Sequence, residues 1–234
     1  KILAREELIN LLKENAFTKP VFIRVNDAMD AIGREDIDAI SPYQDQIEAI
    51  ILPKTQSFDF LATLAPMIDF SNKLVPLIET PRAIDTVTQI AAFKDVVGLF
   101  FGAADSSASL GCKLAWEPLL YARQKVVLAA AMYNLFTIDA PFFYIDDKEG
   151  LKKEAEAVKN LGFTGKAAIH PDQIDFINES FAPTSEEIAE GKKVLEEYQK
   201  SGGGAVKIDG QMVDEPIAEA MRLKISLGEE ENED

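Results

Sequence analysis

The chain has 234 residues, of which 24 are basic and 40 are acidic, so its formal net charge is −16. A surface with this charge repels nucleic acid, and no stretch interleaves basic with aromatic residues, so nucleic-acid binding is excluded. Apolar residues make up 47% of the chain, but no apolar run approaches the roughly 18 residues that a membrane helix needs, so we expect no membrane association and no signal peptide.

Six short β-branched or aromatic runs predict six strands. Helical patterns lie between most of these runs, and strands that alternate with helices predict βα units in a mostly parallel sheet. The runs are nearly continuous in apolar residues, which is typical of strands buried on both faces. The predicted strands are Val21–Asn26, Ala49–Leu52, Lys73–Glu79, Val96–Gly102, Phe136–Asp139 and Lys166–His170.

The helical segments carry start and stop signals. Ser57 and Thr80 are N-cap residues, and Pro81 follows Thr80 in the first turn, where proline is favoured. Gly162 ends a helix, as glycine does at many helix C-termini. The predicted helices are Leu3–Lys13, one from Ser57 through Leu64, one beginning at Pro81, Leu119–Tyr133 and Lys152–Leu161.

The C-terminal part differs in kind, so we predict a barrel-like catalytic body over 1–183 and an extension or lid over 184–234. A capping box at Thr184–Glu187 begins a charged helix that reaches about Lys200, and Ser201–Gly204 is a flexible break. Asp209-Gly210 predicts a hairpin turn between two short strands. The remaining predicted elements are strands Ala205–Ile208 and Gln211–Val213, a helix from Pro216 to about Leu227 and a disordered acidic tail, Gly228–Asp234.

Polar residues stand at the carboxyl end of every predicted strand, where parallel α/β folds place their sites. Glu79 and Asp105 follow two sequential strands, which are usually neighbours in space. Two adjacent carboxylates repel each other unless a cation or a proton lies between them, and oxygen-only ligands favour Mg²⁺. The alternative is that Glu79 pairs with a basic side chain and that Asp105 caps the next helix.

Arg24 lies inside an apolar strand and needs an anionic partner, because burial of an unpaired guanidinium is costly. That partner is either a substrate carboxylate, which fits the planar guanidinium, or a barrel acid such as Glu79. The small-residue turn Gly102–Ser107 lets backbone N–H groups approach an anion, although tight strand-to-helix turns use small residues in any case.

Other polar residues have competing explanations. The single His170 is either a hydrogen-bonded structural residue or a general base. Lys54 and Lys166 are Schiff-base candidates, but neither lies in an obviously desolvating context, and Asp139 is expected to cap a turn. The single Cys112 excludes an internal disulfide and a cysteine-cluster zinc site, and it indicates a reducing, cytoplasmic compartment.

Six motifs occur in a fixed order along the chain and together resemble the citrate lyase beta-subunit-like family of aldolases. That family includes citrate lyase beta subunits and the malyl-CoA and citramalyl-CoA lyases, and the resemblance extends from Lys1 to about Leu227. The motifs are Phe22–Asn26, Leu52–Lys54, Leu77–Thr80, Gly102–Asp105, Gly165–Pro171 and Asp209–Asp214.

The resemblance implies a (β/α)₈ TIM barrel with a small helix–hairpin–helix extension, assembled as a homo-trimer. Such a barrel needs eight strands, and family chains begin with two more strands than the six found here, so we favour a barrel whose first two strands are missing from this chain over an open sheet. The family likeness further implies that Glu79 and Asp105 bind Mg²⁺. Arg24 and the backbone N–H groups near Ala104 and Asp105 would bind the carboxylate of a 2-oxo acid, and Asp214 would reach the site of a neighbouring subunit.

Three positions depart from the family pattern. The family often has an acid where Ala104 stands, a glycine where Ala83 stands and a basic residue where Glu215 stands. The first change removes a charge beside the metal, the second adds a methyl group, and the third alters contacts to the phosphates of CoA. These positions therefore bear directly on activity with the usual thioesters.

The resemblance implies a Mg²⁺-dependent carbon–carbon lyase. It would cleave a 3-hydroxyacyl thioester of CoA or of an acyl carrier (malyl, citramalyl or citryl type) into an acetyl thioester and a 2-oxo acid. Asp214 and Arg24 are the catalytic candidates. The alternatives are a metal-dependent aldolase acting on free 2-oxo-4-hydroxy acids, and a citrate lyase beta subunit that is inactive without its carrier partner.

Overall fold

The computed structural model of the protein describes residues 1–68, 70, 73–202, 204–208 and 210–230, without the side chains at 211, 223–224 and 226–230. The chain forms two compact units, Lys1–Pro171 and Asp172–Asp234. The division falls after Pro171, whereas the predicted body extends to residue 183. Helix α9 (Ile174–Phe181) therefore belongs to the second unit.

Six parallel strands form the sheet of the first unit, in the spatial order in which they occur along the chain. All six strand predictions are confirmed, and the bounds of β2 and β5 are as predicted. The last strand is much shorter than predicted, because only Gly165 and Lys166 pair with β5. The strands are β1 (Phe22–Arg24), β2 (Ala49–Leu52), β3 (Leu74–Ile78), β4 (Gly98–Phe101), β5 (Phe136–Asp139) and β6 (Gly165–Lys166).

The sheet curls on itself, as a ring contact between two non-adjacent strands demonstrates. Phe22 on β1 stacks on Phe136 on β5, with 5.7 Å between the ring centroids. Phe136 also packs against the interior cluster of Ala49, Ile51, Val75 and Leu77. In the described part of the chain, β1 and β6 are the two outer strands of this sheet, so the observed architecture is a curled, six-stranded parallel sheet.

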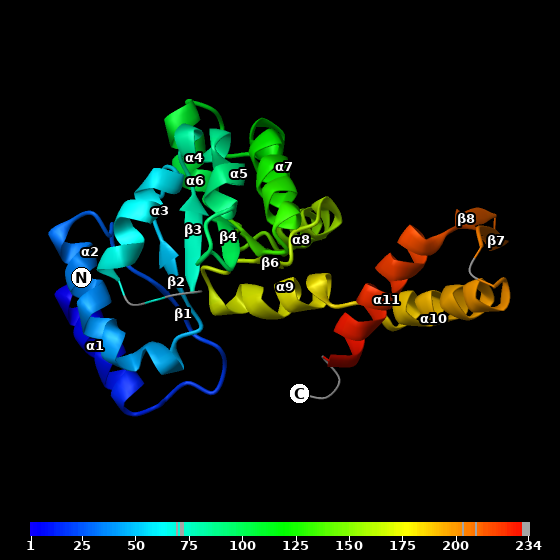
Figure 1. Cartoon of the computed structure of the whole chain (residues 1–234), viewed down its shortest axis with the longest axis horizontal. Coiled ribbons are helices and arrows are strands. Elements are labelled where there is room, and N and C mark those ends of the chain that lie inside the picture. Colours follow the sequence, from blue (N-terminus) through cyan, green and yellow to red (C-terminus); the bar gives the residue numbers. More distant parts are fainter. Residues whose placement is uncertain (69, 71–72, 203, 209, 231–234) are drawn as a thin grey trace. The chain divides into compact units, whose positions relative to one another are not determined.

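Helices follow the strands and lie in an arc around them (Figure 1). The predicted caps are confirmed: Ser57 and Thr80 accept hydrogen bonds from the N–H groups of Phe60 and Ala83, and Gly162 ends a helix with a φ of 105°. Helices α2 and α5 were not predicted, and α6 was expected without bounds, as the helix that follows β4. The helices of this unit are α1 (Ile2–Lys13), α2 (Ala31–Ile40), α3 (Phe58–Leu64), α4 (Pro81–Asp85), α5 (Val87–Ala91), α6 (Ala103–Leu110), α7 (Trp116–Met132) and α8 (Lys148–Leu161).

The second unit has its own apolar core, formed by Val194, Tyr198, Ile208, Val213 and Ala218. Its remaining elements are α10 (Ser185–Lys200), the antiparallel hairpin of β7 (Val206–Ile208) and β8 (Gln211–Val213), and α11 (Glu215–Glu230). The predicted helices and hairpin are thus confirmed, as is the capping box at the start of α10.

Two predictions for the second unit fall partly outside the described residues. They are the break that includes Gly203 and the hairpin turn that includes Asp209. The acidic tail was predicted to be disordered from Gly228, but α11 continues to Glu230, so that prediction is wrong for residues 228–230, while 231–234 lie outside the described part. Within the described residues, no helix is both long and apolar enough to cross a bilayer.

Candidate active site

Glu79 and Asp105 meet at the carboxyl edge of the curled sheet. Glu79 directly follows β3, and Asp105 lies in the first turn of α6, just after β4. The two side chains share a hydrogen bond, and the positive charge of Arg24 at the end of β1 acts on Glu79. Three residues that the sequence singled out separately thus form one cluster.

Glu79 is the buried member of this cluster, with only 4% of its surface exposed. Its Oε1 atom accepts the backbone N–H of Lys54 at 2.7 Å. Burial raises the pKa of Glu79 to about 7, and the neighbouring Asp105 adds to this rise, whereas the Lys54 N–H and Arg24 oppose it. The groups around Glu79 therefore do not fully compensate the negative charge of its carboxylate form.

The turn after β4 allows Glu79 to lie this close. A Cβ atom added to Gly102 would lie 2.6 Å from the Cβ of Glu79 and 3.1 Å from its Oε2. The Gly102 N–H in turn donates to the carbonyl oxygen of Ile78 at 3.0 Å. The sequence indicated that the turn at this glycine lets backbone N–H groups approach an anionic ligand. The structure shows that the missing side chain at Gly102 also leaves space for the Glu79 carboxylate.

Lys54 contributes through its backbone, which the sequence did not reveal. Its φ is 55°, a left-handed conformation that costs free energy for a residue with a side chain. This conformation occurs just after β2 at the residue whose N–H donates to Glu79. The Lys54 side chain is 62% exposed, and its Nζ lies 3.5 Å from Oδ2 of Asp27.

The Glu79–Asp105 pair suits a hard divalent cation. Both donors are carboxylates, and within the part of the chain that the structure describes no third His, Cys, Asp or Glu joins them to form a larger ligand group. Mg²⁺ typically binds one or two carboxylates and completes its shell with water and substrate oxygens. A divalent cation also offsets both the burial of Glu79 and the repulsion between the two carboxylates, so the residues present fit Mg²⁺.

The structure bears on the alternative roles of Glu79 as the partner of a basic side chain and of Asp105 as a helix cap. Among the described residues, Glu79 forms hydrogen bonds with the Lys54 backbone and with Asp105, and with no basic side chain. Asp105 lies in the first turn of α6, where a carboxylate is favoured, but the N-cap position belongs to Gly102. Ala104, beside it, is exposed, and the first N–H groups of a helix lack intrahelical acceptors. These N–H groups are available to an anion at the sheet edge.

Asp139 and Lys166 lie outside this cluster. Side chains alternate along a strand, so Asp139 is on the opposite face of β5 from Phe136 and Ile138. There it accepts hydrogen bonds from Arg123 Nε on α7 and from Lys166 Nζ, each at 2.8 Å. The expectation that Asp139 merely caps a turn was wrong, because this residue is the centre of a buried ion-pair network.

Lys166 was expected to lack a desolvating context, and this was also wrong, because its side chain is fully buried. Its ammonium donates to three acceptors: Asp139 Oδ2 at 2.8 Å, Ala140 O at 2.7 Å and Glu154 Oε1 at 2.7 Å. An ammonium group stabilised in this way is a poor Schiff-base nucleophile. His170 is half-buried beyond the end of β6, and a role for it in catalysis stays a prediction.

Asp214, the predicted C-terminal catalytic acid, lies in the second unit. Its Oδ1 accepts the N–H of Ile217 at 3.4 Å, so it caps the start of α11. Glu215 forms an exposed ion pair with Arg222 at 2.7 Å, and Ala83 is fully buried in α4. The catalytic role of Asp214 stays a prediction.

The family described as HpcH/HpaI aldolase/citrate lyase matches residues 1–171. The chain is 29% identical to the citrate lyase subunit beta of Haemophilus influenzae, over 94% of this chain and 83% of that protein. It is 30% identical to the mitochondrial citramalyl-CoA lyase of Homo sapiens, over 88% of this chain and 67% of that protein.

The fold of this chain is similar to that of solved protein structures. CitE from Mycobacterium tuberculosis, determined with magnesium, acetoacetate and coenzyme A, matches with a TM-score of 0.76 at 29% identity, over 89% of this chain and 78% of that one. RipC from Yersinia pestis matches with a TM-score of 0.71 at 39% identity, over 80% and 85%. This protein therefore belongs to the HpcH/HpaI aldolase/citrate lyase family, whose members include carbon–carbon lyases.

Proposed function

We propose that the protein is a Mg²⁺-dependent lyase that cleaves a 3-hydroxyacyl thioester of the malyl, citramalyl or citryl type. The products are an acetyl thioester and a 2-oxo acid. The observation that carries this proposal is the buried Glu79, hydrogen-bonded to Asp105 and facing the charge of Arg24. The citramalyl-CoA lyase relative and the CitE complex with magnesium, acetoacetate and coenzyme A support it.

Each side chain of the cluster has a role in binding. Arg24 binds the carboxylate of the 2-oxo acid, because a guanidinium matches a carboxylate with two parallel hydrogen bonds. The N–H groups of Ala104 and Asp105 in the first turn of α6 bind the same anion. Glu79 and Asp105 hold Mg²⁺, which when bound supplies a Lewis acid that stabilises negative charge on substrate oxygens.

The reaction breaks the bond between the carbinol carbon and the α-carbon of the thioester. The hydroxyl group gives its proton to solvent as its carbon becomes the carbonyl of the 2-oxo acid. The electron pair of the broken bond forms the thioester enolate, which gains a proton at the α-carbon. Asp214 in its protonated form donates that proton and regains one from solvent, and it acts on the site of a neighbouring subunit in a homo-trimer. We further propose that two more strands pair with the outer edges of β1 and β6 of the described sheet and complete an eight-stranded barrel.

Two other activities compete with this proposal. One rival is the aldolase acting on free 2-oxo-4-hydroxy acids that the sequence left open, and the family description names aldolases. A citrate lyase subunit beta among the relatives favours a subunit that acts only with an acyl-carrier partner as the other. Cleavage of a CoA thioester by this chain alone distinguishes the proposal from both, because the first rival acts on free acids and the second needs its carrier protein.

The test is the release of 2-oxo acid from malyl-CoA, citramalyl-CoA and citryl-CoA, with Mg²⁺ and with EDTA. We expect one thioester to be cleaved only with Mg²⁺, and Glu79→Gln to abolish that cleavage. Glu149→Gln, on the exposed surface of α8, is the matched control and should be fully active. Cleavage that survives both EDTA and Glu79→Gln would falsify the proposal.

A further inference from the structure

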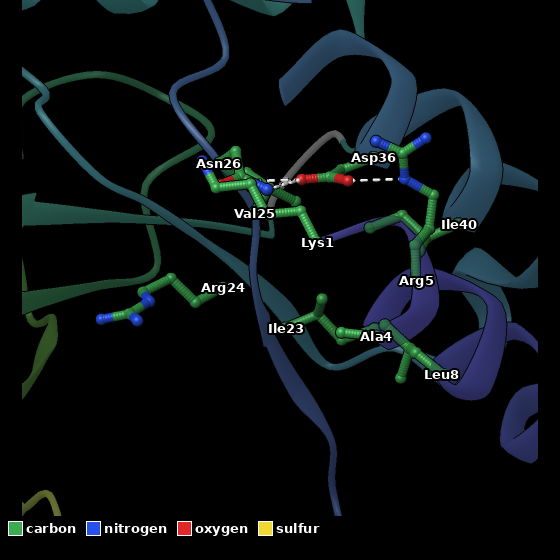
Figure 2. Close-up of a pocket in the computed structure, with 10 residues that line it drawn as sticks. All are labelled: Lys1, Ala4, Arg5, Leu8, Ile23, Arg24, Val25, Asn26, Asp36 and Ile40. Atoms are coloured by element: carbon green, nitrogen blue, oxygen red, sulfur yellow. Dashed lines mark hydrogen bonds and ion pairs between the residues drawn. The ribbon is translucent and has the colours of Figure 1, made fainter. Parts of the chain in front are cut away.

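Asp36 on α2 fixes the carboxyl end of the strand that carries Arg24. It lies beside a pocket of about 260 Å³, lined by α1, β1 and α2 (Figure 2). Its side chain is 13% exposed and accepts three hydrogen bonds. They come from the backbone N–H of Asn26 at 2.9 Å, from Asn26 Nδ2 at 2.5 Å and from Arg5 Nε at 2.7 Å.

These hydrogen bonds lie at the end of β1, where its pairing with β2 stops. In the sheet that the structure describes, β1 is an outer strand and pairs with β2 over three residues that end at Arg24. The next N–H, that of Val25, reaches Ile51 O at a long 3.3 Å. One residue later the backbone N–H of Asn26 binds Asp36 at 2.9 Å instead of a strand. The carboxylate thus continues the backbone hydrogen bonding where the sheet stops.

The two residues on either side of Val25 point in different directions. Figure 2 shows the Asn26 side chain directed to Asp36, whereas the Arg24 side chain extends in a different direction, away from Asp36. Arg24 is on the face of the strand that carries Phe22 and the interior cluster, and its charge acts on Glu79. A rotation of the backbone at Asn26 would therefore turn the Arg24 guanidinium away from the site.

We propose that Asp36 is a positioning residue that holds Arg24 in the orientation needed to bind the carboxylate of the 2-oxo acid. This inference rests on the proposed function. Asp36 touches no reacting group and acts through Asn26 alone. Its partner Arg5 also binds Glu35 Oε2 at 2.9 Å and Ile32 O at 3.2 Å, which anchors the network to α1 and α2.

The charge and shape of a carboxylate are both required here. Burial alone would raise the pKa of Asp36, but the hydrogen bonds from Asn26 and Arg5 hold it below its usual range, so the residue accepts all three bonds as a carboxylate. An asparagine in its place has one acceptor oxygen and an NH₂ group, which would face at least one of these donors. Asp36→Asn therefore keeps nearly the same shape but cannot accept all three hydrogen bonds.

The test is the Kd of pyruvate with Mg²⁺, measured by calorimetry on the full chain. We expect Asp36→Asn to raise this Kd by about tenfold, because small misplacement of a binding group is costly. The Kd of methyl pyruvate, which lacks the carboxylate, should not change. Glu35→Gln is the matched control, because Glu35 binds the same Arg5 but does not contact Asn26, and its Kd should equal that of the wild type.

A second variant guards against a folding defect in Asp36→Asn. Asn26→Ala removes one of the three donors and should raise the Kd for pyruvate in the same direction but less. In the background of Arg24→Gln, Asp36→Asn should have no further effect, because both changes act through one contact. If the wild type with Mg²⁺ binds none of pyruvate, glyoxylate and oxaloacetate, the 2-oxo acids that the three thioesters release, the proposed function is wrong. If it binds, and folded Asp36→Asn or Asn26→Ala binds equally well, the positioning role is wrong.

Discussion

Gly102 passes so close to Glu79 that a Cβ atom at residue 102 would lie 2.6 Å from the Cβ of Glu79. Gly102→Ala must therefore displace either the turn or the carboxylate that we assign to Mg²⁺. We expect the Kd for Mg²⁺ to rise by about tenfold or more, because the two carboxylates no longer converge. Calorimetric titration with Mg²⁺ measures this effect.

Gly111→Ala is the control for that experiment. Gly111 has a φ of 67° and no atom within 4 Å of an added Cβ, so its substitution strains the backbone without touching the site. We expect it to lower the free energy of unfolding by about 1 kcal/mol and to leave the Kd for Mg²⁺ unchanged. A loss of Mg²⁺ binding in Gly111→Ala equal to that in Gly102→Ala would show that general destabilisation explains both.

The pKa of Glu79 predicts how Mg²⁺ binding depends on pH. Burial raises this pKa to about 7, and a proton competes with the cation for the carboxylate. Below pH 7 we expect the affinity for Mg²⁺ to rise up to about tenfold per pH unit, and above that pH this contribution levels off. Titrations between pH 5.5 and 8.5 measure it. An affinity independent of pH across this range would contradict the assignment of Glu79 as a ligand.

The same raised pKa means that, without a bound metal ion, the ionised Glu79 destabilises the folded protein. From its usual value of 4.5 up to about 7, the unfolded chain releases the proton while the folded chain keeps it. Stability from this group therefore falls as the pH rises through that window and is constant above it. At pH 8 without Mg²⁺, we expect Glu79→Gln to raise the free energy of unfolding by about 1 to 3 kcal/mol, and at pH 4 to change it little. Urea unfolding at both pH values is the measurement, and a stability gain at pH 4 equal to that at pH 8 would be inconsistent with it.

Asp139 holds Arg123 and Lys166 together between the sheet and the helices, with all three side chains buried. Asp139→Asn leaves Lys166 with Glu154 as its carboxylate partner and removes from the buried Arg123 the carboxylate that it binds. We expect the free energy of unfolding to fall by about 3 to 5 kcal/mol, as for other broken buried pairs. Glu196→Gln, which breaks an exposed pair with Lys200, is the control and should cost less than about 1 kcal/mol. Equal losses in the two variants would contradict this account.

Features that depend on neighbouring residues in the chain were predictable. The caps Ser57, Thr80 and Thr184 bind N–H groups three residues ahead, so a short sequence pattern specifies them. The strands β2 and β5 are continuous runs with sharp ends, and their bounds were predicted correctly. The convergence of Glu79 and Asp105 also followed, because sequential parallel strands place their ends side by side.

Features that depend on which face a residue occupies were not predictable. Asp139 and Glu79 both end strands, yet one faces the helices and the other the interior, and a shift of one residue in a strand end reverses this choice. The left-handed Lys54 carries no local signal, since lysine does not favour that conformation. The hydrogen bonds of Asp36 to Asn26 likewise join residues that no sequence pattern links.

The stack of Phe22 on Phe136 bears on how the chain acquires its fold during synthesis. The two rings belong to the first and fifth strands, so the contact closes a very long loop, and its formation carries a large entropic cost. On the ribosome, β1 emerges well before the ring that it stacks on has been made. The early βα units must therefore wait without this stack, and their exposed apolar surface makes the nascent polypeptide prone to aggregate during that interval.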